Sequence, residues 1–75
     1  RDPKSYLQEI SQRVDNQTPV YKVLSEEGPD HDKVFTLGVF VGDNMMGRGI
    51  GPSKQVAQQQ AARAAIAKYK ESGEK

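Results

Sequence analysis

Cysteine and tryptophan are absent from this sequence of 75 residues, and His31 is its single histidine. Without cysteine the chain can build neither a disulfide framework nor a thiolate metal site. One histidine holds a metal only if several carboxylates converge on it. We therefore expect no metal and no cofactor in this domain. A chain this short also has no room for a deep, enclosed active site, because small domains bury a modest share of their surface.

Long apolar runs are also absent, and no signal-peptide pattern opens the chain. A helix that spans a bilayer needs about 20 predominantly apolar residues, and a secretory signal needs a basic start followed by an apolar stretch. The sequence thus predicts no membrane partner and a cytoplasmic location. The first residue, Arg1, is not an initiator methionine, so we expect the chain to be a piece of a longer protein.

Residue sets that carry catalysis are missing as well. The sequence shows no Ser/His/Asp or Cys/His arrangement and no H-E-x-x-H motif, and its acidic residues are scattered or lie in predicted loops. We therefore expect this chain alone to have no enzymatic activity.

The net charge of +1 is small for a nucleic-acid-binding protein, but the charges are unevenly placed. Residues 1–45 carry five Lys/Arg and eight Asp/Glu, and residues 46–75 carry six Lys/Arg and two Glu, which gives −3 and +4. This asymmetry is compatible with a basic end that faces phosphates. It is equally compatible with an ordinary helix that ends in solvated lysines, and charge alone favours that simpler interpretation.

A helix is predicted at the start of the chain. Asp2 can cap it, and Pro3 suits the first helical position, where no N–H partner is needed. An apolar stripe then recurs at helical spacing: Pro3, Leu7, Ile10 and Val14. Asp15-Asn16, with Pro19 shortly after, predicts the end of this helix.

Three strands are predicted next, over residues 20–24, 33–41 and 45–49. In the second of them, apolar side chains alternate on one face: Phe35, Leu37, Val39 and Val41. A polar loop, residues 25–32, contains the turn signal Gly28-Pro29. Gly42-Asp43-Asn44 has the composition of a hairpin turn, and residues 49–52, which are rich in glycine and end in proline, are expected to break the third strand.

A second helix is predicted from its cap, Ser53, to about Tyr69. Its apolar positions form two neighbouring rows: Ala57, Ala61 and Ala65, and beside them Ala62, Ile66 and Tyr69. An alanine-rich face allows a helix to lie close against a sheet.

These elements predict an α+β fold of order α-β-β-β-α, in which two helices pack on one face of a three-stranded antiparallel sheet. We expect a single domain over residues 1–75, with its core at about 2–69 and a frayed polar tail at 70–75. The expected core residues are Leu7, Ile10, Val14, Phe35, Leu37, Val39, Ala57, Ala61, Ala65 and Ile66. Phe35 and Leu37 are the firmest of these, because strand alternation and the helix stripes both point to that layer.

The first candidate binding surface is the polar face of the first helix, formed by Ser5, Gln8, Glu9 and Gln12. These side chains combine donors with acceptors, which suits contacts with ribose 2′-hydroxyls and base edges in a shallow minor groove. Any surface helix has a polar face, however, so this feature alone favours an ordinary solvated helix.

The second candidate is the loop that carries His31. An exposed histidine can donate into a groove, although a solvated loop histidine is the simpler interpretation when it is taken alone. Glu26, Glu27 and Asp30 lie nearby, and their negative charge makes phosphate binding by this loop unfavourable.

The third candidate is the segment that leads into the second helix, residues 47–54 (GRGIGPSK). Glycine-rich backbone before a helix N-terminus offers N–H groups and a helix dipole to an anion. Lys54 places a cation where that dipole disfavours one, which a bound phosphate would explain. The spacing fits neither nucleotide-binding glycine motif, and a tight turn followed by a cap remains the alternative.

Three runs in this order resemble the double-stranded-RNA-binding domain family: residues 2–9 (DPKSYLQE), 28–31 (GPDH) and 47–54 (GRGIGPSK), followed by Ala57 and Ala61-Ala62. The resemblance extends from about Asp2 to Tyr69, and the first two runs look most like the C-terminal domain of a bacterial-type ribonuclease III. It implies the α-β-β-β-α fold and binding of double-stranded RNA by shape.

The resemblance also implies roles for particular residues. The first helix would contact a minor groove, with Ser5, Gln8 and Glu9 at matching positions and Gln12 on the same face. The loop with His31 would enter the next minor groove, about 16 base pairs being spanned in all. The start of the second helix would hold phosphates across the major groove, through Arg48, Ser53, Lys54, Gln55 and Gln58.

The parent protein implied by the resemblance is an endoribonuclease that processes RNA. Its catalytic domain would lie upstream of Arg1, would need Mg²⁺, and would be the part through which the parent forms a homodimer. None of these properties is expected of the 75-residue chain by itself.

The sequence departs from the family at one functional position. Members usually carry a lysine cluster at the start of the second helix, whereas here Lys54 is followed by Gln55 and Gln58. Glutamine can donate to phosphate oxygens but releases no counterion, so we expect weak binding. The departure leaves open a rival interpretation, in which the domain has diverged toward protein–protein contacts.

Overall fold

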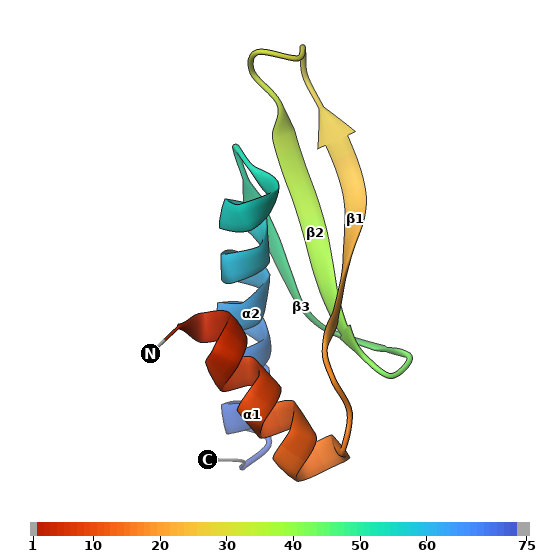
Figure 1. The fold of residues 1–75 in the computed structure, drawn as a ribbon, viewed down its shortest axis with the longest axis vertical. Helices are drawn as coiled ribbons and strands as arrows, with labels where there is room; N and C mark the ends of the chain where they lie inside the picture. The colour runs from red at the N-terminus through yellow and green to blue at the C-terminus, as the bar shows by residue number, and fades with distance from the viewer. Residues whose placement is uncertain (1, 74–75) are drawn as a thin grey trace.

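Two helices and a three-stranded meander make up the fold, in the predicted order (Figure 1). The computed structural model describes residues 2–73. Its elements are α1 (Pro3–Asp15), β1 (Val20–Glu27), β2 (Val34–Val41), β3 (Asn44–Gly51) and α2 (Lys54–Glu71). The strands pair antiparallel in the order β1-β2-β3, which confirms the predicted fold class.

The helix ends follow their local sequence signals. The Asp2 carboxylate accepts from the backbone N–H of Ser5 at 3.2 Å, and Pro3 is the first residue of α1. Asn16 closes α1 in the left-handed conformation, φ 55°, which Asn tolerates better than most residues. At α2, the Ser53 hydroxyl accepts from the N–H of Val56 at 3.2 Å. Both predicted caps are therefore confirmed.

The first two strands differ from their predicted bounds. β1 continues to Glu27, three residues beyond Leu24, and its last residue pairs with Val34 at the start of β2. A bulge between Val23 and Ser25 leaves Leu24 without a direct partner. The polar composition of the end of β1 predicted a loop, but backbone pairing across a ladder does not require apolar side chains.

The third strand is also longer than predicted, and it corrects the interpretation of its glycines. β3 runs from Asn44 to Gly51, so Ile50 and Gly51, which were expected to break the strand, belong to it. Gly42 begins the turn before it with φ 61°, a conformation that glycine adopts without strain. A bulge opposite Val39 and Phe40 leaves Met46 as the extra residue of β3. Pro52 follows directly after the strand, where no ladder hydrogen bond is required of it.

The glycines of β3 allow the backbone of α2 to lie directly against the strand. A Cβ atom on Gly47 would lie 2.6 Å from the Ala65 nitrogen, and one on Gly49 would lie 2.5 Å from the Ala61 nitrogen. Real Cβ atoms do not come within 3.0 Å of backbone, so no larger residue fits at either position without a shift. The predicted alanine face of α2 is confirmed, and its partner is this row of glycines.

The core lies between α1, α2 and the inner face of the sheet. Eight of the ten expected core residues are buried, and Val14 packs against the core while partly exposed. Phe35 is only partly buried, because it pairs with Gly51 at the end of the sheet. Its selection as one of the firmest core residues was therefore wrong, although the alternation with Leu37 is confirmed. Ser11, which was not expected in the core, is fully buried.

The two helices lie side by side and run in the same direction. At their first turns the Lys4 ammonium donates to the Gln58 carbonyl oxygen at 2.8 Å. At their last turns the Tyr69 hydroxyl donates to the Asp15 carboxylate at 2.5 Å. These two contacts place the start of α1 beside the start of α2.

The C-terminal end of α2 lies beyond its predicted limit. The helix continues to Glu71, so the expectation of a frayed tail from Lys70 was wrong for its first two residues. Residues 74–75 of that tail, like Arg1, lie outside the described residues. Within residues 2–73, neither helix is long and apolar enough to cross a membrane.

Gly49→Ala is expected to destabilise the domain by about 3 kcal/mol, because the added methyl group overpacks the contact with α2. For a domain of this size that means a fall in Tm of more than about 10 °C. Gly38→Ala is the matched control: it adds the same methyl group in the same sheet, against the flexible end of Met45. Thermal unfolding of both variants measures the difference, and equal Tm values would contradict the close packing of α2 on β3.

Candidate nucleic-acid interface

The polar face of α1 is exposed along its whole length. Ser5, Gln8, Glu9 and Gln12 all have exposed side chains. The Ser5 hydroxyl donates to the Asp2 carboxylate at 3.2 Å, and the Gln12 amide donates to the Thr18 hydroxyl at 2.7 Å. Each of these side chains keeps further donor or acceptor capacity, so the structure brings the four predicted residues together on one accessible surface.

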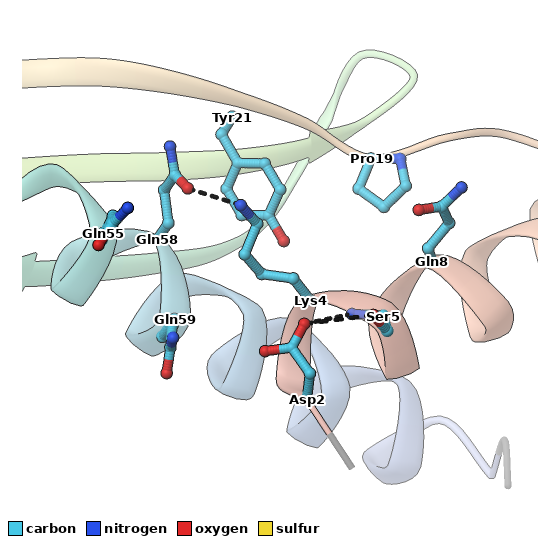
Figure 2. Close-up of a pocket in the computed structure, with 9 residues that line it drawn as sticks. All are labelled: Asp2, Lys4, Ser5, Gln8, Pro19, Tyr21, Gln55, Gln58 and Gln59. Carbon is cyan, nitrogen blue, oxygen red and sulfur yellow. Dashed lines mark hydrogen bonds between the residues drawn. The ribbon is translucent and has the colours of Figure 1, made fainter.

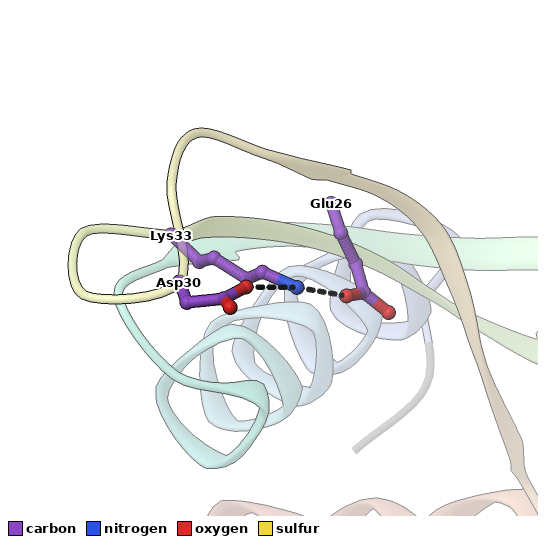
Figure 3. A network of polar contacts seen from close by, with 3 residues as sticks. All are labelled: Glu26, Asp30 and Lys33. Atoms are coloured by element: carbon purple, nitrogen blue, oxygen red, sulfur yellow. Dashed lines mark hydrogen bonds and ion pairs between the residues drawn. The ribbon is translucent and has the colours of Figure 1, made fainter.

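The loop between β1 and β2 carries His31 at an exposed position. Its backbone is closed by a hydrogen bond from the Asp32 N–H to the Pro29 carbonyl oxygen at 2.9 Å. Lys33, beside it, lies 3.3 Å from a Glu26 oxygen and 3.7 Å from an Asp30 oxygen (Figure 3). Two carboxylates thus compensate the charge of Lys33.

The start of α2 presents exposed donors and no competing carboxylate. Its first turn contains no acidic residue, so no carboxylate within that turn competes with an anion for the positive end of the helix dipole. Lys54 and Gln55 are exposed there. The Lys54 ammonium lies 5.8 Å from the centroid of the Phe35 ring, within cation–π range. This contact is a second explanation for a cation in the first turn, beside a bound phosphate.

Among the residues predicted to hold phosphate at the start of α2, Arg48 is the one whose side chain lies elsewhere. Its neighbours Gly47 and Gly49 face α2, and side chains alternate along a strand. The exposed Arg48 side chain therefore lies on the outer face of the sheet, opposite Gly38. Residues 45–49 were predicted to be a strand, and the rule of alternation applied to that strand would have placed Arg48 on the face opposite Gly47 and Gly49 from the sequence alone.

The polar face of α1, the start of α2 and the β1–β2 loop follow one another along the longest axis of the molecule. Figure 1 shows α1 toward one end, the start of α2 above it, and the β1–β2 loop at the far end. The molecule extends 40 Å along this axis.

A pocket of about 460 Å³ opens where α1, α2 and β1 meet (Figure 2). Its lining residues come from all three elements and from Asp2 and Pro19 beside them: Asp2, Lys4, Ser5, Gln8, Pro19, Tyr21, Gln55, Gln58 and Gln59. The pocket thus joins Ser5 and Gln8 of α1 to Gln55 and Gln58 of α2. Sequence reasoning missed Lys4, Tyr21 and Gln59, because nothing local in the sequence brings α1 beside α2.

Tyr21 forms part of the pocket wall with its hydroxyl oxygen inaccessible to solvent and without a hydrogen-bond partner. Burial, and after it the negative charge of Asp2, raises the pKa of this hydroxyl above 10.0. The group is therefore a neutral donor at physiological pH.

The described part of this surface offers no metal site. Among residues 2–73, no group of three or more His, Cys, Asp or Glu side chains could hold a metal ion. The surface is instead rich in neutral amides and hydroxyls, which donate to and accept from a polar ligand without a change of charge.

Comparison with known proteins identifies relatives along nearly the whole chain. The family described as "Double-stranded RNA binding motif" matches residues 3–69. "Ribonuclease 3" of Protochlamydia amoebophila is 48% identical over 68 residues, which are 91% of this chain and 28% of that protein. "Ribonuclease 3" of Moorella thermoacetica is 46% identical over 72 residues, 96% of this chain and 31% of that protein. The chain thus spans less than a third of these relatives.

Solved structures also resemble it. The first double-stranded-RNA-binding domain of protein HYL1 superposes with a TM-score of 0.78 at 32% identity, covering 93% of this chain and 99% of that one. Dicer from Pichia stipitis superposes with a TM-score of 0.71 at 30% identity, covering 88% of this chain and 32% of that one. Fold, sequence and structural neighbours agree, and the chain belongs to the double-stranded RNA binding motif family.

Proposed function

We propose that this chain binds double-stranded RNA by shape, as the RNA-binding domain of a longer ribonuclease III. The observation that carries the proposal is the succession of three polar segments along one 40 Å axis. A duplex of about 16 base pairs offers two successive minor grooves with a major groove between them. The α1 face and the His31 loop suit the minor grooves, and the start of α2 suits the phosphates between them.

Each segment has the chemistry that its groove requires. Ser5, Gln8, Glu9 and Gln12 can exchange hydrogen bonds with 2′-hydroxyls and base edges. Ser53, Lys54, Gln55 and Gln58 surround N–H groups at a helix N-terminus, where phosphate is favoured. His31 can donate into the second minor groove, whereas Arg48 lies on the outer sheet face, away from the start of α2.

We assign catalysis and dimer formation to the rest of a longer protein. Its relatives named Ribonuclease 3 are more than three times as long, which supports an endoribonuclease whose catalytic domain is elsewhere. We propose that this catalytic domain uses Mg²⁺, forms the homodimer and processes RNA in the cytoplasm. The RNA-binding domain contributes the substrate's position and needs no cofactor of its own.

The domain is expected to bind duplex RNA at least about tenfold more tightly than duplex DNA of the same sequence, because DNA lacks the 2′-hydroxyls that α1 contacts. Glu9→Ala should weaken binding to RNA and leave the weaker binding to DNA unchanged. Glu71→Ala, at the far end of α2, is the control for a lost negative charge. Fluorescence anisotropy with both duplexes measures this, and equal affinities would show that only charge is recognised.

Binding is expected to depend weakly on salt, because the surface offers few cations. The salt slope counts neutralised phosphates, and we expect roughly two or three of them. Lys54→Ala should lower the slope by about one unit and weaken binding to all duplex sequences alike. If affinity and slope both stay the same, the start of α2 does not hold phosphate. Absence of binding by the unmodified chain at low salt would favour the protein–protein interpretation instead.

Gln55→Lys is the corresponding gain-of-binding variant, and it should raise both affinity and salt slope by restoring one lysine of the family's cluster. Gln58 is a poorer choice for this test, because its carbonyl oxygen accepts from Lys4 at 2.8 Å. A lysine there would place two ammonium groups side by side. Titrations at several salt concentrations compare Gln55→Lys with the unmodified chain, and an unchanged slope would argue against phosphate beside this residue.

The purified chain is expected to leave long duplex RNA intact in the presence of Mg²⁺. Metal-dependent cleavage requires clustered carboxylates to hold the ion, and residues 2–73 contain no such cluster. Gel electrophoresis of the RNA after incubation measures the outcome. Cleavage that grows with protein concentration and survives further purification would contradict it.

A further inference from the structure

The pocket between α1, α2 and β1 contains a cation whose hydrogen-bond partner and ring contact are both uncharged. The Lys4 ammonium donates to the neutral Gln58 carbonyl oxygen at 2.8 Å and lies 5.3 Å from the centroid of the Tyr21 ring. Both partners orient the ammonium without neutralising it. By contrast, Lys33 in the β1–β2 loop lies near two carboxylates. An ammonium held in this way is preorganised for an anion.

The hydroxyl of Tyr21 is a second donor at the same place. Its oxygen is buried and has no hydrogen-bond partner, which costs free energy unless a ligand or water completes it. In Figure 2 the Lys4 side chain passes across the Tyr21 ring. The hydroxyl can donate to a ligand in the pocket once the side chains that cover it move aside.

One carboxylate, that of Asp2, lines the pocket and opposes an anion. It already accepts from both the backbone N–H and the hydroxyl of Ser5, each at 3.2 Å. These bonds stabilise its charge at the N-cap of α1. The other polar groups in the wall are the amides of Gln8, Gln55, Gln58 and Gln59, which can turn N–H groups toward an acceptor.

The place of the pocket in the surface identifies the anion. The pocket lies between the α1 face, which suits a minor groove, and the start of α2, which suits the neighbouring major groove. The strand that separates two grooves of a duplex is a sugar–phosphate backbone. Its phosphodiester carries one negative charge and only acceptor oxygens at its phosphate, which complements a pocket whose ammonium and hydroxyl are donors. A volume of about 460 Å³ accommodates more than a bound ion.

We infer that this pocket binds one phosphodiester of the duplex strand that separates the two grooves, with the Lys4 ammonium and the Tyr21 hydroxyl as its donors. The inference rests on the proposed function, since it adds a phosphate site to the same RNA surface. It makes Lys4 a binding residue in addition to Lys54. It also assigns a role to a hydroxyl that has no partner within the described chain.

Lys4→Met tests the charge, because methionine keeps most of the length and apolar contact of the lysine side chain. Titration with duplex RNA at several salt concentrations should show a slope lower by about one unit and an affinity roughly tenfold lower near 0.1 M salt. Lys4→Arg should retain the slope. Lys22→Met is the matched control: its ammonium lies 4.9 Å from the Phe40 ring centroid, away from the pocket.

Tyr21→Phe tests the hydroxyl and separates binding from folding. Loss of an unpartnered buried hydroxyl should leave Tm unchanged or raise it, so weaker binding cannot be ascribed to unfolding. We expect affinity for duplex RNA to fall several-fold at an unchanged salt slope, because no charge is lost.

The outcomes distinguish this inference from the proposed function. If Lys54→Ala lowers the slope while Lys4→Met and Tyr21→Phe bind like the unmodified chain, the pocket holds no phosphate and RNA binding stands. If Lys4→Met and Lys22→Met lose the same slope, Lys4 acts only through net charge, and the inference is overturned. Absence of RNA binding by the unmodified chain at low salt overturns both.

Discussion

The contact between the α2 backbone and β3 determines where every other part of the surface lies. Gly47 and Gly49 leave no side chain between strand and helix, and Ala61 and Ala65 supply the matching helix face. Because backbone meets backbone, α2 cannot slide along the strand without collision, and packed interiors transmit such constraints rather than absorb them. The start of α2 is therefore held in one place relative to the sheet, and with it the N–H groups of its first turn.

From that fixed helix the position of α1 follows. Two polar contacts at opposite ends, Lys4 with Gln58 and Tyr69 with Asp15, keep α1 in register beside α2. Leu7 and Ile10 fill the apolar space between them. The polar face of α1 and the start of α2 are thereby joined into one rigid surface. Such rigidity suits recognition of shape, because a duplex is distinguished by the spacing of its grooves more than by any single contact.

The sequence allowed the fold and the family to be predicted because its strongest signals are local. Asp2 and Ser53 act as caps within three residues of their own positions, and alternation around Leu37 is a property of one strand. Two errors came from context that no local pattern contains. Phe35 has the right alternation but lies where the sheet ends beside Gly51. The end of β3 was misplaced because glycine and proline usually mark a loop, whereas Gly49 and Gly51 belong to the strand and Gly49 admits α2. Lys4 and Tyr21 were missed for the same reason: they meet across elements distant in sequence.

Short-range donors and the surroundings of each lysine explain how a domain of net charge +1 can suit a polyanion. Long-range attraction from so small a charge is weak, so specificity for a duplex must come from short-range donors placed at the spacing of its backbone. Amides, hydroxyls and helix N–H groups do this without counterion release. The few cations then matter according to their partners. Lys33 forms ion pairs with Glu26 and Asp30. Lys54 instead lies over the ring of Phe35, which does not neutralise its charge, so the charge can still attract a phosphate. In this surface the arrangement of partners around each lysine, rather than the number of lysines, decides which of them can serve the ligand.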